Sequence, residues 1–293
     1  MSNSQPGILA PVPPFARCIS FQLSPGEDPL NALGNLAERT LGDDLVVGIG
    51  QPLALALQSE IPGLRGFTSL CGPGISIPST QAALWCWLRG TDRGELMHAG
   101  RALEADLDPS FEVDQILDTF VYAGGRDLTG YEDGTENPTG DDAQAAGILS
   151  NAGPGLDGSS FVAVQQWVHD FEVFEGIPLA EQDDIIGRRR SDNAELDDAP
   201  ASAHVKRTAQ EDFAPPAFLV RRSMPWVDDD GEGLLFIAFG RSLDAFDAQL
   251  SRMTGAEDGV VDGLFRFTRP ITGGFYWCPP QIGGRLDLDA LDD

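Results

Sequence analysis

Alternating and continuous apolar stretches divide the chain into predicted strands and helices. Residues 17–23 alternate, with Ile19, Phe21 and Leu23 on one face, which is the period of a half-buried strand. Residues 29–42 then carry leucines at helical spacing, and residues 45–49 form a short apolar run. The pattern predicts a strand, a helix and a second strand in this order.

A strand, a turn and a helix are predicted twice, about half a chain apart. Residues 81–88 hold a run that is apolar on both faces, and a predicted helix follows from Arg93. Residues 234–239 have the same character, and a predicted helix follows from Leu243. The repetition favours an α+β protein of two similar halves, each a sheet with helices on one face.

Composition shifts mark the expected limits of these halves. Residues 1–16 hold four prolines and are expected to form an extended arm over the surface or over a neighbouring subunit. The N-terminal domain is expected at residues 17–145 and the C-terminal domain at residues 146–284, with the glycine-rich stretch 140–158 as their connection. Residues 285–293 predict a mobile acidic tail.

Charge and hydropathy limit the partners and the location of the protein. The 293 residues carry a formal net charge of -27 with a pI near 4.2. This argues against nucleic acid as a partner, because phosphate binding needs a basic surface. No stretch approaches the roughly 18 apolar residues of a membrane span, and the N-terminus lacks the basic start and apolar core of a secretion signal. A cytoplasmic protein without membrane contact is therefore expected.

Cysteines and histidines are the first candidates for metal chemistry. The four cysteines form no C-x-x-C pair, so neither a zinc site nor a disulfide framework is indicated. His98 lies on a predicted helix and His169 follows a strand, so both are expected to be structural. His204 follows a loop, where ligands are often presented, and no second histidine is near enough to complete a zinc site. It is either a haem ligand or a structural histidine.

Three carboxylates and no aliphatic residue occupy one glycine-bounded loop, Gly130-Tyr131-Glu132-Asp133-Gly134-Thr135-Glu136-Asn137-Pro138. Gly130 and Gly134 permit backbone angles that other residues avoid, so Asp133 is held between two hinges. The loop is either a rigid mount for one functional acid or a solvated turn. Arg221, at the end of an apolar run, is either part of a site or paired with one of the many carboxylates.

Taken together, the loop 130–138, the segment Ala203-His204-Val205 and the segment Arg221-Arg222-Ser223-Met224-Pro225 resemble the dye-decolorising peroxidase family, most closely its compact B-type bacterial members. The resemblance covers nearly the whole chain and includes residues 5–9, 89–94 and 272–275. The family fold is a pair of ferredoxin-like domains with one haem b (iron protoporphyrin IX) in the second. The resemblance therefore implies an α+β fold of two such domains.

The resemblance also implies the catalytic roles. His204 would be the proximal iron ligand, Asp133 the distal acid-base residue and Arg221 the distal cation. Asp133 would move a proton between the two oxygens of hydrogen peroxide, and Arg221 would stabilise the charge that develops as the O–O bond breaks. The product would be a ferryl intermediate, which two one-electron donations from a reductant return to ferric iron. Arg221 is expected to contribute more to peroxide cleavage than Asp133.

Five further positions follow from the resemblance as contacts of the cofactor. Asp262 matches an acid that hydrogen-bonds the ring N–H of the iron ligand, Arg188 matches an arginine that pairs with a haem propionate, and Phe236 is expected on the distal wall. Thr135 is expected to contact the cofactor from the acidic loop. Ser223 stands where some members carry asparagine, so the distal hydrogen-bond network is expected to differ here.

The protein is therefore expected to be a haem-dependent peroxidase that reduces hydrogen peroxide and oxidises aromatic or phenolic compounds and dyes. One alternative is a haem-handling protein that stores haem or removes its iron, with incidental peroxidase activity. Another is an acidic interaction protein without haem. The proline-rich arm and the family resemblance favour a homo-oligomer. Some family members are packed inside protein shells through a C-terminal address, but residues 286–293 show no pattern that indicates this role.

Overall fold

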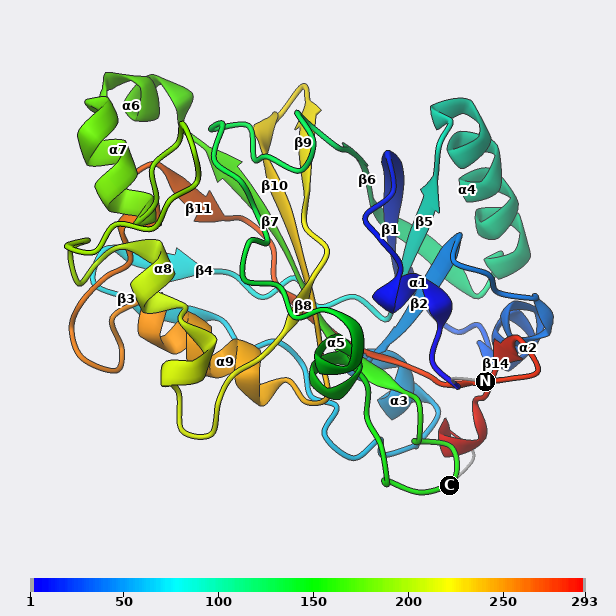
Figure 1. Ribbon diagram of the computed structural model, residues 1–293. Coiled ribbons are helices and arrows are strands. Elements are labelled where there is room, and N and C mark those ends of the chain that lie inside the picture. The colour runs from blue at the N-terminus through cyan, green and yellow to red at the C-terminus, as the bar shows by residue number, and fades with distance from the viewer. Residues whose placement is uncertain (1–2, 292–293) are drawn as a thin grey trace.

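One sheet closes on itself into a barrel, and helices pack against its outer surface (Figure 1). The structure is a computed structural model and describes residues 3–291. The strands within this range are β1 (Phe15–Leu23), β2 (Leu45–Gly50), β3 (Leu70–Gly72), β4 (Ile75–Ile77), β5 (Leu84–Gly90), β6 (Phe111–Phe120), β7 (Ser160–His169), β8 (Val220–Arg221), β9 (Met224–Asp228), β10 (Gly231–Gly240), β11 (Thr268–Pro270), β12 (Gly274–Cys278), β13 (Gln281–Ile282) and β14 (Arg285–Leu286). The helices are α1 (Pro6–Leu9), α2 (Leu30–Glu38), α3 (Gln51–Ala56), α4 (Arg93–Leu107), α5 (Gly140–Gly147), α6 (Phe171–Gly176), α7 (Leu179–Ile186), α8 (His204–Arg207) and α9 (Asp244–Met253), with short 3-10 turns η1 (Gln210–Asp212), η2 (Gly263–Arg266) and η3 (Asp289–Leu291).

The main sheet joins the two halves of the chain. Its order is β11-β7-β12-β2-β5-β1-β6-β9-β10-β8, and β10 also pairs with β7, so that eight strands form a closed ring. The pairs β2 with β12 and β6 with β9 connect N-terminal strands to C-terminal strands. The α+β class is confirmed, but the expected separate sheets are replaced by one shared sheet, because the edges of the two halves pair with each other.

Strand β5 is apolar on both faces because each face packs into a hydrophobic cluster. Trp85 and Trp87 pack with other aromatic side chains in a cluster inside the barrel, while Leu84 and Leu88 pack outward in the cluster that contains residues of α2 and α4. Figure 1 shows α4 lying across the outside of the N-terminal strands. Burying each of these large side chains contributes about 1.5–3 kcal/mol. Both faces of the strand are core, and alternation of polar and apolar residues is therefore lost.

Most of the predicted elements are confirmed. The strand predicted at residues 17–23 begins slightly earlier, at Phe15, and the helix predicted from Arg93 is capped by the Asp92 carboxylate, which accepts the N–H groups of Gly94 and Glu95. The other confirmed elements are α2, β2, β7, β10 and α9.

The proline-rich N-terminal segment is not an extended arm. Residues Pro6–Leu9 form α1, and Ile8 is fully buried. The buried amide of Gln5 donates to the carbonyls of Val47 and Pro279 and accepts the N–H of Val47. The segment packs into its own chain because these two side chains find apolar and hydrogen-bonding partners there. Residues 1–2 of the predicted arm lie outside the described residues.

The acidic C-terminal segment is also packed rather than free. Strand β14 pairs with β13, and Leu286 and Leu291 are each only 7% exposed. These leucines lie among the aspartates and anchor the segment in the core. The prediction of a mobile tail weighed the acidic residues and overlooked the leucines. Residues 292–293 lie outside the described residues. In the connection between the halves, residues 140–147 form α5, where only a loop was expected.

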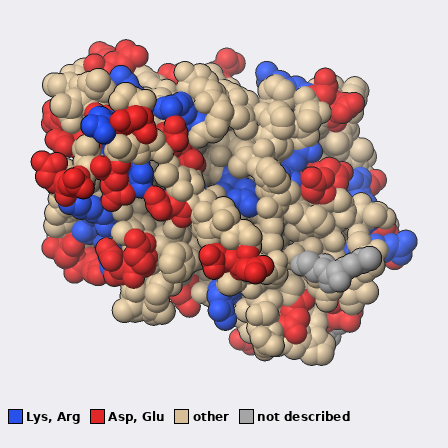
Figure 2. Space-filling model, in the orientation of Figure 1, with Lys and Arg blue, Asp and Glu red and all other residues tan. Residues whose placement is uncertain are grey.

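The surface agrees with the acidic composition. Figure 2 shows acidic side chains spread over this face, most densely on its left half, with basic side chains only in small patches between them. The face shows no continuous basic surface of the kind that binds a nucleic acid backbone. Among residues 3–291, no helix is both long and apolar enough to cross a membrane.

Candidate functional site

His204 is the first residue of the short helix α8 and lies on the wall of a largely apolar pocket. Its Nδ1 is 2.8 Å from Oδ2 of Asp262, whose side chain is fully buried. The other oxygen of Asp262 accepts the N–H of Leu264 and caps η2. Because a carboxylate accepts hydrogen bonds, we assign the ring proton to Nδ1, which leaves the lone pair on Nε2. The histidine is thus oriented as a ligand.

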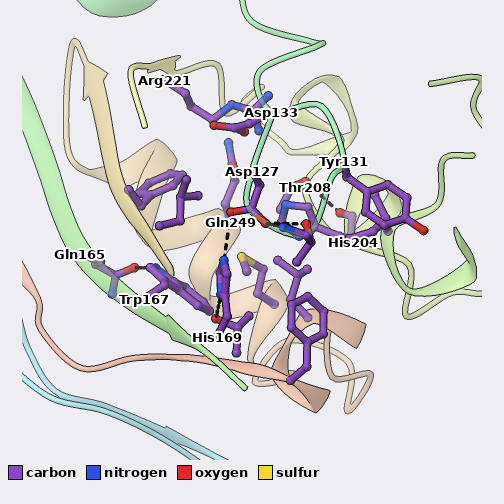
Figure 3. Close-up of a pocket in the computed structure, with 18 of the residues that line it drawn as sticks. Asp127, Tyr131, Asp133, Gln165, Trp167, His169, His204, Thr208, Arg221 and Gln249 are labelled. Atoms are coloured by element: carbon purple, nitrogen blue, oxygen red, sulfur yellow. Dashed lines mark hydrogen bonds and ion pairs between the residues drawn. The ribbon is translucent and has the colours of Figure 1, made fainter. Parts of the chain in front are cut away.

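Asp133 and Arg221 lie on the same pocket as His204, presented from a loop and from β8 (Figure 3). Gly130 and Gly134 have φ values of 88° and 75°, which L side chains rarely adopt, so the loop needs glycine at both positions. The prediction that these glycines are hinges around Asp133 is confirmed.

Asn137 ties the Asp133 loop to the arginine strand. Its side-chain oxygen accepts the N–H of Arg221 at 2.8 Å, and its side-chain nitrogen donates to the carbonyl of Arg221 at 2.7 Å. The Asn137 amide thus pairs with both the N–H and the carbonyl of Arg221, as a neighbouring strand would. Sequence reasoning treated Asn137 as a turn former and missed this contact, which spans 84 positions. Nothing in the local sequence indicates it.

The side chains of Asp133 and Arg221 are available to a ligand. Within the described residues neither takes part in an ion pair or a side-chain hydrogen bond, and Nε of Arg221 is buried without a partner. Both residues also line two adjoining pockets, one of which reaches Arg188 and the other Ser223. An unsatisfied buried polar group in a folded protein calls for an explanation, and a group bound in this pocket would supply one.

The remaining pocket wall is mainly apolar. Phe236 of β10 lies on it as predicted, and α9 contributes Phe246, Leu250 and Met253. Other lining side chains that sequence reasoning did not select are Tyr131, Gln165, Trp167, Leu234, Gln249, Leu264 and Phe267. A flat apolar cofactor with a polar edge would be buried by such a wall.

His169 shares the pocket but is engaged differently. Its Nε2 is 2.9 Å from Oδ1 of Asp127, and its Nδ1 is 2.7 Å from the hydroxyl of Thr268. Burial pushes the pKa of Asp127 up, but the hydrogen bond and charge of His169 and two bonds from Thr129 outweigh it and hold the pKa below its ordinary value. With both ring nitrogens occupied, His169 has no lone pair to offer a ligand. His98 is exposed on α4 and does not line this pocket.

Three of the predicted cofactor contacts lie near the pocket rather than on it. Arg188 is buried and donates to Glu136 at 2.6 Å and to Glu195 at 2.8 Å. The hydroxyl of Thr135 accepts from Asn193 at 2.8 Å. The hydroxyl of Ser223 is buried without a partner among the described residues.

The donor set would suit a metal that is already held by a cofactor. Within residues 3–291 there is no group of three or more histidine, cysteine or acidic residues that could hold a bare metal ion. A single oriented imidazole in an apolar pocket instead suits a metal held in a macrocycle, as in haem. The orphaned Nε of Arg221 across the same pocket agrees with a group that the protein binds there.

Comparison with known proteins defines the class. A family model described as Dyp-type peroxidase, C-terminal, matches residues 124–283, and the chain belongs to the Dyp-type peroxidase family. It is 33% identical over 223 residues to a dye-decolorizing peroxidase of Mycobacterium tuberculosis, covering 74% of this chain and 66% of that protein. The chain thus spans just under two thirds of the length of that relative.

Solved structures share the complete fold. A dye-decolorizing protein from Vibrio cholerae has a TM-score of 0.86 at 28% identity, with 99% of both chains covered. A variant of DypB from Rhodococcus jostii RHA1, in complex with heme, has a TM-score of 0.87 at 25% identity and covers 95% of this chain and 97% of that one. The predicted family resemblance is confirmed.

Proposed function

We propose that the protein is a haem-dependent peroxidase that reduces hydrogen peroxide and oxidises aromatic compounds by one-electron steps. One observation carries the proposal: a single pocket joins an imidazole fixed by Asp262 to an acid and an arginine whose side chains have no partner among the described residues. Membership of the Dyp-type peroxidase family and a relative with bound heme support it.

The fixed imidazole of His204 would bind the iron of a haem. When bound, haem would supply the iron that takes up peroxide and the ring that holds oxidising equivalents. His204 would offer Nε2 to this iron. Asp262 accepts the hydrogen bond from Nδ1–H, which keeps the proton on Nδ1 and makes the imidazole a stronger electron donor. The apolar wall excludes water, which strengthens the electrostatic effect of the charged side chains.

Asp133 and Arg221 divide the proton transfer and the charge stabilisation. As a carboxylate, Asp133 takes one proton from hydrogen peroxide and returns it to the departing oxygen, so that water leaves. Arg221 is fixed through its backbone by Asn137 and directs a permanent positive charge to the oxygen that becomes negative. Ser223, in the adjoining pocket, has a free hydroxyl that would complete this network through a bound water.

Arg188 and Thr135 would meet the polar edge of the cofactor. Both line the pocket that adjoins His204. Arg188 uses three of its five N–H groups on Glu136, Glu195 and the carbonyl of Asn193, so two remain for a propionate. Because Glu136 and Glu195 would repel a propionate, the positive charge of Arg188 would have to hold it.

Three further parts of the proposal concern fold and assembly. Numbered along the chain within each half, the strand orders β6-β1-β5-β2 and β12-β7-β10-β9 both run 4-1-3-2, which supports two ferredoxin-like units joined at residues 145–146. A homo-oligomer rests on the family alone, because α1 packs into its own chain. A cytoplasmic location is retained as a proposal, and fractionation of the producing cells tests it.

The visible spectrum of haem-loaded protein, before and after one equivalent of hydrogen peroxide, tests the proposal. We expect a Soret band that loses intensity and shifts, followed by its return on adding a phenol. Haem binding without a response to peroxide would refute the peroxidase, and the appearance of iron-free porphyrin would establish the haem-handling alternative. Failure to bind haem would refute both.

A further inference from the structure

A second cavity, the barrel cavity, opens at one end of the barrel. It has a volume of about 320 Å³, a size that suits a small organic molecule. Its inner wall belongs to the apolar cluster inside the barrel and includes Trp85 and Tyr276. Its outer part is polar and includes Ser20, Asp114 and Gln115, of which the last two are exposed to solvent. An apolar interior with a few polar groups at the entrance is typical of ligand sites in the mouths of β-barrels.

A single layer of sheet separates the barrel cavity from the pocket of His204. Val164 of β7 and Leu235 of β10 line the barrel cavity. The next residue of each strand, Gln165 and Phe236, lines the pocket of His204, because successive side chains of a strand point to opposite faces. Among residues 3–291, no residue lines both. A ligand in the barrel cavity would therefore not touch a haem in the other pocket.

An irregularity in β6 turns Asp114 toward the barrel cavity. Ser20 of β1 pairs with Gln115. The next residue of β1, Phe21, pairs with Val113, so Asp114 is an extra residue without a partner on β1. In a regular strand two consecutive side chains would point to opposite faces, but Asp114 and Gln115 line the same cavity. This is the effect of a β-bulge, which re-aims a side chain and is common at the rims of barrels.

The Asp114 carboxylate has no positive partner in the described part of the chain. It forms no ion pair there, and its side chain accepts only a long hydrogen bond of 3.5 Å from the hydroxyl of Ser20. No arginine or lysine among residues 3–291 lines the barrel cavity. The negative charge reaches the inner wall, since burial raises the pKa of Tyr276 and Asp114 raises it further. The barrel cavity therefore favours a cation over an anion.

The inner wall offers two aromatic rings to a bound molecule. Trp85 and Tyr276 are stacked, with ring centroids 5.9 Å apart and an angle of 22° between the rings. Nε1 of Trp85 is buried without a hydrogen-bond partner among the described residues. The thiol of Cys18 lies near this N–H, but sulfur is a weak acceptor. An aromatic ring bound here would offer its face to the N–H, and the aromatic wall would attract a cation.

We propose that the barrel cavity binds a small organic cation, with an ammonium group carried on an aromatic body. The ammonium group pairs with Asp114 and donates to the amide oxygen of Gln115. That oxygen is free for this contact because the amide nitrogen of Gln115 donates to Gln166 at 2.7 Å. The aromatic body lies against Trp85 and Tyr276. The site is independent of the proposed reaction with hydrogen peroxide.

Isothermal titration calorimetry of the haem-loaded protein, without hydrogen peroxide, tests the proposal with three probes of nearly equal size. These are phenethylammonium, the neutral phenethyl alcohol and the anion phenylacetate, none of which is a phenol. Wild type should bind the ammonium about tenfold more tightly than the alcohol and should not bind the anion measurably. In Asp114→Asn the ammonium and the alcohol should bind equally. Glu112→Gln removes a charge from the same strand outside the barrel cavity, so this matched control should keep the preference.

The Soret band, followed in the same titration, distinguishes the barrel cavity from the iron. It should not change, because an amine bound to the iron would shift it. A Soret shift with the same midpoint as the heat would overturn the proposal. Equal affinity of wild type for the ammonium and the alcohol, or a preference that persists in Asp114→Asn, would overturn it as well. None of these results bears on the peroxidase, which is tested by the response to hydrogen peroxide.

Crystals soaked with the para-bromo analogue of phenethylammonium locate the ligand without any substitution in the chain. Anomalous scattering should place the bromine beside Trp85 and Tyr276, with the ammonium group at Asp114. A bromine found only outside the barrel cavity would overturn the site.

Discussion

Two histidines that line one pocket are each paired with an aspartate, and the pairs differ in which ring nitrogens they leave free. His204 is bound to Asp262 through Nδ1 alone, whereas His169 is bound through both ring nitrogens, to Asp127 and to a threonine hydroxyl. The first pair is 25% and 0% exposed at its side chains and the second 5% and 14%. His204 is thus half-buried and its acid fully buried, while His169 is the better covered of the two histidines.

The difference shows that pairing with an acid does not define a functional histidine. What distinguishes the two residues is the count of ring nitrogens left without a protein partner. An imidazole with one free nitrogen can bind a metal, and one with none serves to join elements. His169 joins the end of β7 to Asp127, six residues before Asp133. It therefore positions the loop that carries Asp133, the proposed acid-base residue.

The largest effect expected is the loss of haem on removing His204. His204→Ala should lack the Soret band of the loaded wild type because no other imidazole offers a free nitrogen to the pocket. His169→Ala should still bind haem. Absorption titration with haem measures both, and the exposed His98→Ala on α4 is the control. A variant at position 204 that binds haem as tightly as wild type would contradict the assignment.

Removing the distal side chains should slow the reaction with peroxide without releasing haem. Asp133→Ala should lower the second-order rate constant by about 10²–10⁴, the usual contribution of a positioned acid-base group. Arg221→Ala should lower it more, since the arginine stabilises the charge that develops as the O–O bond breaks. Stopped-flow absorption gives both values, with the exposed Arg241→Ala as a control. The reverse ranking would refute this division of roles.

Asp262→Asn should have a smaller effect on the ligand pair. An amide still holds the His204 ring but no longer supplies negative charge, so affinity for haem or activity should fall by about 10–100-fold. The potential of the iron should also rise, because a less electron-rich imidazole favours reduced iron. Spectroelectrochemistry measures the shift. An unchanged potential would mean that Asp262 only orients the ring.

The smallest effect concerns acid stability at the second pair. The pKa of Asp127 is lowered in the folded protein, so its contribution to stability is present above the unfolded pKa of about 3.9 and is lost as the pH falls through the folded pKa. His169→Gln removes the charged partner and should move acid unfolding to higher pH. Circular dichroism between pH 6 and pH 2 measures the midpoint. The same midpoint in the variant and in wild type would show that the pair contributes nothing.

The sequence pattern predicted those elements that depend on residues close together in the chain. The strands at residues 17–23 and 234–239 and the glycine hinges at Gly130 and Gly134 follow from periodicity and backbone freedom, and all are present. The closure of the sheet was not predictable in this way. It depends on single pairings such as Thr119 with Trp226 between strands far apart in the chain.

The site shows the same division. His204, Asp133 and Arg221 were selected through the family resemblance, and the structure brings them to one pocket. Tyr131 and Asn137 lay within the recognised loop but gave no separate signal, because their partners are 52 and 84 positions away. The packed ends of the chain were missed for a related reason. The prolines at the N-terminal end and the aspartates at the C-terminal end indicated extended or mobile segments. A few buried apolar side chains, Ile8, Leu286 and Leu291, hold both segments against the core.

Asn137 hydrogen-bonds the main chain of Arg221 and not the guanidinium group of that residue. Mutation is therefore tolerated unequally at the two positions. Exchanging the side chain at 221 leaves both amide contacts in place. A different side chain there would therefore leave the backbone of the loop and of β8 in position. Exchanging Asn137 removes both contacts. Loss of the arginine should accordingly remove a charge from the pocket without moving the loop, whereas loss of the asparagine should disturb the position of both.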